Sequence, residues 1–352
     1  MPNFAFHNVG ISGVSAAVPK KRIKNASLSR IFKKAAVEKI ISVTGIEERR
    51  SAGKNTCSSD LCFAAAERLI LEAGIEKDAI DVLIFVSQTP DYRQPSTAAI
   101  LQDRLGLKKG TASLDMNLAC SGYVYGLSAA FSYASNLKEN AKVLLLAGET
   151  FSKIVSSKDK ATALLFGDAG SATLVERGDF GKSYFSLNSD GSGENIIKID
   201  SGGYRRMSRH RSLMPRKRPN GSVRSDEQLF MDGAEVFNFT LREIPRDILS
   251  LLRYANVPGG KIDYFILHQA NKLILELLAK KIGCPAAKLP LSLKKFGNTG
   301  SASIPLTLVS ELKDTLGRKK KKVLLSGFGG GLSWASCVTD IGRCPVCCVI
   351  EV

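Results

Sequence analysis

The sequence predicts an α/β fold made of two similar halves. Apolar, strand-like runs alternate with helical patterns along most of the 352 residues, which is typical of sheets covered by helices. The pattern then recurs, because residues 263–267 echo residues 81–85 and residues 323–327 echo residues 143–148. The spacing between the paired runs is nearly the same in both halves. An internal duplication is the economical explanation.

The elements of the first half each have a local signal. Alternating or continuous apolar residues predict strands over 9–18, 81–86 and 143–148. Helical spacing of apolar residues predicts helices over 28–43, 58–73 and 96–105. The second of these helices has a serine cap at Ser58 or Ser59 and a terminating Gly74. Residues 163–175 form two apolar pieces about a glycine-containing turn.

Three segments are expected along the chain. The first half occupies residues 1–180, a basic and irregular excursion occupies 181–230, and the second half occupies 231–352. No acidic residue lies between Ser201 and Ser225, where eight basic residues occur: Arg205, Arg206, Arg209, Arg211, Arg216, Lys217, Arg218 and Arg224. Such a cluster attracts nucleic acid, anionic membranes or acidic proteins, or is a solvated loop. Its scarcity of aromatic residues argues against a nucleic-acid site based on stacking.

Composition narrows the class of protein. The formal net charge is +17, and 44% of the residues are hydrophobic, as in an ordinary globular protein. No apolar run is long enough for an integral membrane segment, and no signal peptide is evident, so a cytoplasmic location is expected. The eight cysteines are too irregularly spaced for a disulfide framework. Cys344, Cys347 and Cys348 lack a second ligand pair, so no metal site is expected.

Cys120 is the candidate nucleophile. Apolar residues recur at helical spacing from Val124 onward, so Cys120 is predicted to lie at a helix N-terminus. Unpaired backbone N–H groups and the helix dipole there lower the pKa of a thiol and favour the thiolate. The alternative is that Cys120 is a small buried hydrophobic residue, as most free cysteines are.

Further polar residues follow the predicted strands of the second half. His268 comes directly after residues 263–267, Asn298 lies downstream, and a glycine turn at 327–331 follows the last strand. If the halves pack as pseudo-repeats, these strand ends meet near Cys120. Each residue alone has an alternative interpretation. His268 can be a buried core histidine, Asn298 a turn-forming residue, and the glycines part of a tight turn. Their joint placement favours an active site.

Five motifs occur in a specific order along the chain. They are the sequences LACSG at 118–122, FGDAG at 166–170, HQAN at 268–271, GNT at 297–299 and GFGGG at 327–331. Trp334 follows the last of them. With these motifs the chain resembles the β-ketoacyl-acyl carrier protein synthase III enzymes of the thiolase superfamily, over nearly its whole length.

The resemblance implies a thiolase-like, five-layered αβαβα fold and a homodimer. It implies an acyltransferase in which Cys120 takes an acyl group from a thioester of coenzyme A or of acyl carrier protein. Backbone N–H groups of Cys120 and Gly330 form the oxyanion hole. His268 and Asn298 stabilise the enolate formed when malonyl-acyl carrier protein loses CO2, and the product is a 3-oxoacyl thioester. No metal or redox cofactor is implied.

A degradative thiolase is a weaker alternative. Thiolases use a second cysteine as acid and base in the glycine-rich C-terminal region. The nearest cysteine here, Cys337, follows Trp334 and lies outside the glycine turn.

The sequence departs from the family where the starter is bound. Family members carry a tryptophan and an arginine before the Thr-Gly-Ile turn to clamp the adenine of coenzyme A, whereas residues 39–43 here are Lys-Ile-Ile-Ser-Val. Gln94 stands where the family often has an apolar residue that reaches the partner subunit's acyl pocket. Lys160 matches a basic contact to the nucleotide, and Asn271 and Phe328 are the other residues expected to contact substrate.

These departures indicate a specialised synthase whose starter arrives on an acyl carrier protein. The carrier is expected to dock through Lys272, Lys280 and Lys281, aided by the basic segment. The alternatives are an acyltransferase of secondary-metabolite or surface-glycolipid synthesis that does not elongate, and an inactive paralogue that binds polyanions. No contact with nucleic acid is expected of an active synthase.

Overall fold

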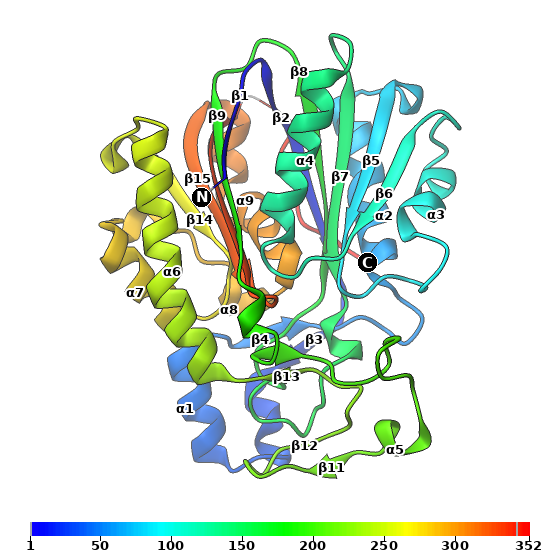
Figure 1. The fold of residues 1–352 in the computed structure, drawn as a ribbon, viewed down its shortest axis with the longest axis vertical. Helices are drawn as coiled ribbons and strands as arrows, with labels where there is room; N and C mark the ends of the chain where they lie inside the picture. Colours follow the sequence, from blue (N-terminus) through cyan, green and yellow to red (C-terminus); the bar gives the residue numbers. More distant parts are fainter. Residues whose placement is uncertain (1, 343) are drawn as a thin grey trace.

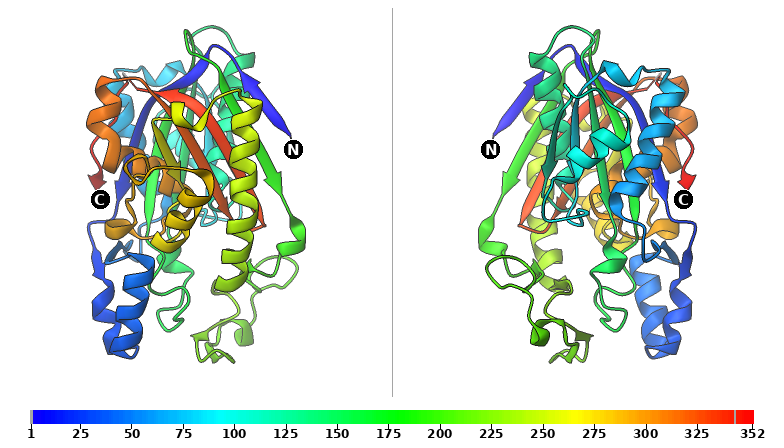
Figure 2. Two further views of the ribbon diagram at one scale, coloured as in Figure 1. Left: turned by 90° about the vertical axis from the view of Figure 1, so that its left-hand side faces the viewer. Right: turned by 90° about the vertical axis from the view of Figure 1, so that its right-hand side faces the viewer.

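The helices and strands of the computed structural model form five layers, and residues 2–342 and 344–352 are described (Figures 1 and 2). Two sheets enclose the helices α4 (Gly122–Asn136) and α9 (Ser303–Arg318), each of which contacts both sheets. Helices α2 (Ser58–Ala73) and α3 (Thr97–Arg104) cover the first sheet on its outer face. Helices α6 (Gly233–Tyr254) and α7 (Lys272–Ile282) cover the second. The predicted αβαβα arrangement is therefore confirmed.

The first sheet contains six strands in the order β17-β2-β8-β7-β5-β6. Their bounds are Ile350–Glu351, Val9–Val18, Ala169–Arg177, Lys142–Glu149, Ile80–Val86 and Ala112–Met116. The strand β7 is parallel to β5 and antiparallel to β8. The strands expected over 9–18, 81–86 and 143–148 are therefore confirmed to within one residue at each end.

The second sheet repeats this pattern with five strands in the order β1-β9-β16-β15-β14. Their bounds are Asn3–Phe6, Ser183–Ser189, Ser333–Ile341, Lys321–Gly329 and Tyr264–Leu267. Here β15 is parallel to β14 and antiparallel to β16, and β16 is antiparallel to β9. The four strands β2, β8, β7 and β5 thus have counterparts in β9, β16, β15 and β14, as expected of a duplication.

The structure corrects the expected boundary between the halves. The irregular segment was expected to begin at residue 181, but Ser183–Ser189 is the strand β9, which occupies the place of β2 in the second repeat. Two serines of this strand are buried because they bond to side chains of other elements: Ser186 to Asp247 of α6 and Ser183 to Thr339 of β16. The irregular segment therefore begins after β9.

Two helix predictions also need correction. The helix expected over 28–43 is a 3-10 helix over Asn25–Arg30 followed by α1 (Lys34–Thr44). The buried side chain of Asn25 donates hydrogen bonds to the carbonyls of Ile46 and Leu164, which fixes the chain ahead of α1. Helix α2 has the predicted bounds, but its N-cap is Cys57. The N–H of Cys57 donates to the carboxylate of Asp60 at 2.8 Å.

Small elements surround the lower end of the two sheets in Figure 1. They are the strand pairs β3 (Arg22–Lys24) with β4 (Glu48–Arg50), β10 (Ile197–Lys198) with β13 (Phe230–Met231), and β11 (Arg216–Lys217) with β12 (Val223–Arg224), and the helices α5 (His210–Leu213) and α8 (Leu293–Phe296).

The C-terminal residues close one edge of the first sheet. Strand β17 runs parallel to β2, and Cys347 is buried in the core beneath α2. Among the described residues, no group of three or more His, Cys, Asp or Glu side chains is placed to hold a metal ion.

No helix within residues 2–342 and 344–352 is long and apolar enough to cross a membrane.

Candidate active site

Cys120 lies in the turn between β6 and α4, two residues before the helix begins. The turn is closed by the N–H of Gly122, which donates to the carbonyl of Ala119 at 2.8 Å. The hydroxyl of Ser121 lies 2.7 Å from that of Ser333 at the start of β16, which ties the turn to the second half. The predicted place of Cys120 at a helix N-terminus is confirmed.

Glycines of β15 allow that strand to pass directly against Cys120. A Cβ on Gly329 would lie 3.1 Å from Cys120 Sγ, and one on Gly327 would lie 2.7 Å from the carbonyl oxygen of Cys120. Side chains at these two positions would collide with the nucleophile or its backbone. The glycine motif therefore serves the close approach of the two halves.

The predicted lowering of the pKa of Cys120 is wrong. The side chain is only 8% exposed, and burial raises the pKa of its thiol well above the ordinary range. The nearby carboxyl of Glu149 acts in the same direction. Desolvation of the thiolate outweighs the helix N-terminus here, so Cys120 is a neutral thiol at neutral pH.

His268 follows the last residue of β14, and its ring is held from two sides. Its Nδ1 lies 2.8 Å from the hydroxyl of Ser303, and its ring meets Phe328 edge to face at 5.3 Å. The Ser303 hydroxyl accepts the N–H of Gln269 at 3.4 Å, so its own hydrogen is available to Nδ1. When the hydroxyl donates to Nδ1, the ring hydrogen of His268 lies on Nε2.

The charge state of His268 agrees with that arrangement. Burial lowers the pKa of His268 to about 3, so the imidazole is neutral at neutral pH. A neutral ring with its hydrogen on Nε2 can donate one hydrogen bond to a substrate oxygen.

Asn298 is fixed by hydrogen bonds of its backbone and its side chain. Its N–H donates to the carbonyl of Leu165, and its own carbonyl accepts the N–H of Gly167, both at 2.9 Å. The side-chain oxygen accepts the N–H of Gly300, also at 2.9 Å. Because Oδ1 is occupied, the amide NH2 of Asn298 is the group available to a substrate.

One cavity of about 610 Å³ brings the predicted residues together. Cys120, His268, Asn298 and Gly330 line it, as do Lys160, Asn271 and Phe328. Its apolar part is formed by Phe151, Ile154, Leu165, Phe166, Ile197, Leu229 and Met231. The exposed Lys160 and Ile199 are among its outer lining residues, so the cavity connects a buried thiol and an apolar pocket to the surface.

Four predicted residues do not line this cavity. Gln94 is exposed, in the segment before α3, and it does not contribute to the cavity of the single chain. Lys272, Lys280 and Lys281 are exposed along α7, and Lys272 pairs with Glu276 of the same helix at 3.7 Å.

The structure also shows what two of the lining residues do in the fold. Asn271 caps the N-terminus of α7, because its Oδ1 accepts the N–H of Ile274 at 2.8 Å. Phe328 is buried and supports the ring of His268.

Glu149 is a buried residue of the site that the sequence analysis missed. It ends β7, and its carboxyl accepts the N–H of Gln88 at 3.1 Å and the hydroxyl of Ser301 at 3.1 Å. Burial raises the pKa of Glu149 to about 8, so the carboxyl is mostly protonated at neutral pH.

Gln88, also missed, lines the cavity and donates to the side-chain oxygen of Asn117 at 2.7 Å. It follows the end of β5, as His268 follows its counterpart β14, and this shared position was the signal available in the sequence.

Comparison with known proteins gives consistent matches. Residues 114–191 match the family model of 3-oxoacyl-[acyl-carrier-protein] synthase III, and residues 252–341 match the model of its C-terminal part. A β-ketoacyl-[acyl-carrier-protein] synthase III of Staphylococcus saprophyticus is 35% identical, over 96% of this chain and 100% of the relative. One of Streptococcus mutans is 37% identical, over 94% and 98%.

A solved structure extends these matches to three dimensions. The 3-oxoacyl-(acyl-carrier protein) synthase of Burkholderia xenovorans LB400 superimposes with a TM-score of 0.93 at 38% identity. The superposition covers 100% of this chain and 99% of that one.

Proposed function

Because the chain belongs to the 3-oxoacyl-[acyl-carrier-protein] synthase III family, we propose that it condenses an acyl thioester with malonyl-acyl carrier protein. The observation that carries the proposal is the convergence of Cys120, His268 and Asn298 on one cavity. A thiol, a neutral imidazole and an amide NH2 are the groups that this condensation requires. The product is a 3-oxoacyl thioester, with release of CO2.

In the first step, Cys120 takes the acyl group of the starter. Its sulfur attacks the thioester carbonyl while the thiol loses its proton; His268 is not the base, because its Nδ1 faces Ser303 and its Nε2 carries the ring hydrogen. The leaving thiolate of the carrier or coenzyme A takes up that proton. Backbone N–H groups of Cys120 and Gly330 stabilise the oxyanion of the tetrahedral intermediate.

In the second step, malonyl-acyl carrier protein loses CO2 and becomes an enolate. Nε2–H of His268 and the NH2 of Asn298 donate hydrogen bonds to the enolate oxygen, because the other polar atoms of both side chains are already bonded. The enolate carbon attacks the acyl carbonyl on Cys120 and expels its thiolate, which takes a proton from solvent water. No carbon is oxidised or reduced by an outside reagent in these steps, so the proposal includes no metal or redox cofactor.

The starter is proposed to lie with its acyl chain in the apolar part of the cavity, around Phe151 and Phe166. The exposed Lys160 at the outer part suits an anionic phosphate of the arm that carries the thioester. The residues at 39–43 offer no aromatic ring for an adenine, which favours a starter held on a carrier protein.

A homodimer is proposed for the active form. Strand β6 lies at an edge of the first sheet, where a second copy of the strand can pair. Gln94 lies in the segment before α3, which packs on β6, and so would face the partner subunit.

We also propose that Lys272, Lys280 and Lys281 attract the acidic carrier along α7, and that the enzyme acts in the cytoplasm.

Intact-protein mass spectrometry tests the proposed function. Incubation with a panel of acyl-CoA and acyl-carrier-protein thioesters is expected to add one acyl mass to the wild type and none to Cys120→Ala. The variant Cys348→Ala, which removes an exposed thiol, is the matched control and should acylate as the wild type does.

Two results would contradict the proposal. One is an adduct that persists in Cys120→Ala, and the other is the absence of an adduct with every thioester. Acylation without a 3-oxoacyl product after addition of malonyl-acyl carrier protein would favour the alternative of plain acyl transfer.

A further inference from the structure

A strongly basic segment lies beside the entrance of the cavity. We call residues 201–228 the basic cap; it contains α5, β11 and β12, at the bottom of Figure 1. Its first acid along the chain is Asp226, which follows eight basic residues. The proposed mechanism uses none of these charges.

Some of the basic residues are neutralised within the protein. Asp226 pairs with both Arg216 and Arg218, the latter at 2.5 Å. Arg224 lies 3.8 Å from Asp159, with its guanidinium 4.7 Å from the centre of the Phe230 ring. These three arginines hold the cap together and are not available to a partner.

The remaining basic residues face solvent. Exposed side chains without an ion pair to any described residue are those of Arg205, Arg206, Arg209, Arg211 and Lys217. Apolar side chains are exposed among them, with Met207 60% and Leu213 57% accessible. A surface that mixes cations with apolar groups suits an acidic protein face better than a bare phosphate backbone.

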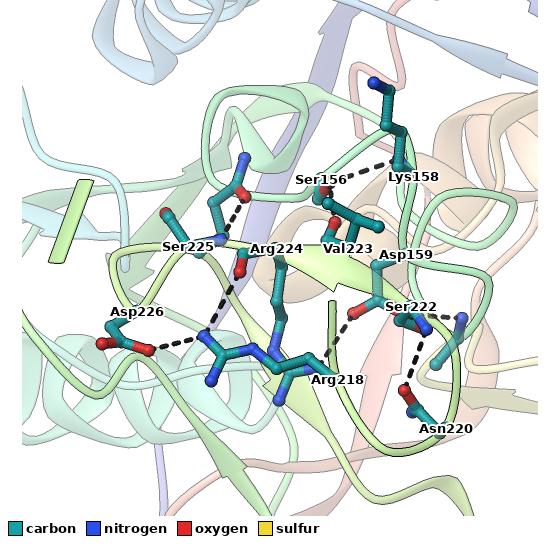
Figure 3. Close-up of polar contacts among 12 residues, drawn as sticks. Ser156, Lys158, Asp159, Arg218, Asn220, Ser222, Val223, Arg224, Ser225 and Asp226 are labelled. Carbon is teal, nitrogen blue, oxygen red and sulfur yellow. Dashed lines mark hydrogen bonds and ion pairs between the residues drawn. The ribbon is translucent and has the colours of Figure 1, made fainter. Parts of the chain in front are cut away.

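The cap is anchored to the loop that forms the cavity entrance (Figure 3). The side chain of Asp159 is 1% exposed and accepts the hydroxyl of Ser222 at 2.8 Å and the N–H of Ala161 at 3.0 Å. The hydroxyl of Ser156 donates to the carbonyl of Val223 at 2.6 Å. Lys160 and Ala161, next to Asp159, line the cavity. The position of β12 relative to the entrance is therefore fixed.

We infer that the basic cap docks the acidic face of the acyl carrier protein that brings the thioester to Cys120. The inference rests on the proposed function, because that function supplies a partner whose flexible arm must enter this cavity. Charge complementarity selects the partner, and the Asp159 anchor holds the docking surface in register with the entrance.

The test compares malonyl-acyl carrier protein with malonyl-pantetheine, a substrate that lacks the carrier protein. A triple variant, Arg209→Glu, Arg211→Glu and Lys217→Glu, is expected to raise KM for malonyl-acyl carrier protein at least about tenfold. Kinetics with malonyl-pantetheine should not change. The matched control reverses three exposed lysines at the opposite ends of the strands, Lys109, Lys138 and Lys182, and should behave as the wild type.

A second variant distinguishes docking on a cap that Asp159 holds at the entrance from unspecific electrostatic attraction of the carrier. Asp159→Asn makes the protein more positive, so unspecific attraction predicts tighter carrier binding. Anchored docking predicts weaker binding, by several-fold, because the cap is no longer held at the entrance. The readout is the Kd of unloaded carrier protein by fluorescence anisotropy, which needs no catalysis.

Unchanged carrier kinetics and binding in the triple variant would overturn the inference. So would a cap that binds anionic phospholipid vesicles or single-stranded RNA at physiological salt while the triple reversal leaves carrier binding intact. Cap-dependent binding of the carrier in a protein that forms no 3-oxoacyl product would support the docking surface while refuting the proposed function.

Discussion

At the scale of the residue, burial decides the chemistry of the site. The thiol of Cys120 and the ring of His268 both lie in a desolvated cavity, which raises the pKa of the first and lowers that of the second. Both groups are therefore neutral before the reaction begins. Charge forms only during the reaction, where the hydrogen-bond donors of the site can stabilise it.

Ser303 is expected to set which nitrogen of His268 carries the hydrogen. Ser303→Ala removes the hydroxyl 2.8 Å from Nδ1 and frees the ring to place its hydrogen there instead of on Nε2. We expect the rate of condensation to fall about tenfold, the effect of one lost hydrogen bond, with little change in KM.

The measurement is steady-state kinetics with malonyl-acyl carrier protein, beside mass spectrometry of the acylated enzyme. Ser303→Thr retains the hydroxyl and should largely restore the rate. An unchanged rate in Ser303→Ala would show that the tautomer does not depend on this hydroxyl.

At the scale of the element, Glu149 connects the end of β7 to two other segments of the chain. Its carboxyl bonds to the segment after β5 through Gln88, and to the turn after Asn298 through Ser301. It thus links two parts of the cavity wall from behind. Because the folded state keeps this carboxyl protonated up to about pH 8, the unfolded chain holds fewer protons between its ordinary pKa and that value.

Stability is therefore expected to fall as pH rises from about 4.5 to about 8, in proportion to this difference in bound protons. Glu149→Gln cannot ionise, so it should gain stability relative to the wild type over this window, by up to a few kcal/mol. Chemical unfolding at pH 5 and pH 8 measures the change.

Glu149→Ala is the contrasting variant, because it leaves Gln88 and Ser301 without their acceptor and should destabilise at both pH values. A wild type and a Glu149→Gln variant with parallel pH profiles would refute the raised pKa.

The elements also show which parts of the fold could be predicted from sequence. Helix α2 could be predicted because its apolar spacing and Gly74 are local signals. Strand β9 could not, because its buried Ser183 and Ser186 look polar until their partners Thr339 and Asp247 are known. Local patterns do not contain such distant bonds.

The same distinction applies to the site. Cys120, His268 and Asn298 were placed from strand ends and motifs, and the structure brings them to one cavity. Glu149 and Ser303 were missed, since their roles depend on contacts with residues 61 and 35 positions away. The pKa of Cys120 was predicted in the wrong direction because burial is a property of the whole fold.

At the scale of the whole molecule, the C-terminal residues close the first sheet. The N–H of Cys347 donates to the carbonyl of Val14 at 3.0 Å, and that of Val352 to Val18 at 2.9 Å. Glu351 pairs at 2.8 Å with Arg50, whose side chain is only 5% exposed. The last residues thus cover an edge of β2 that would otherwise be open.

Removal of residues 345–352 is expected to destabilise the protein by about 2–4 kcal/mol, because it uncovers this edge and leaves Arg50 without its carboxylate. Thermal unfolding and light scattering measure the effect, and the truncated chain should also aggregate more readily. Glu351→Gln separates the ion pair from the strand and should account for a minor part of the loss. A truncated chain with an unchanged melting temperature would show that the tail is dispensable.

The pairing of β1 with β9 has a consequence for the time course of synthesis. Residues 3–6 are made long before residues 183–186, with which they pair, and the ring of Phe6 packs against that of Phe185 at 5.5 Å. At roughly 5–20 residues per second, the first strand waits roughly 10–40 s for its neighbour. One edge of β2 waits longer still, for β17 at residues 350–351. The growing chain therefore exposes an edge of β1 until β9 is made and an edge of β2 until β17 is made, and the nascent protein is expected to need protection during that time.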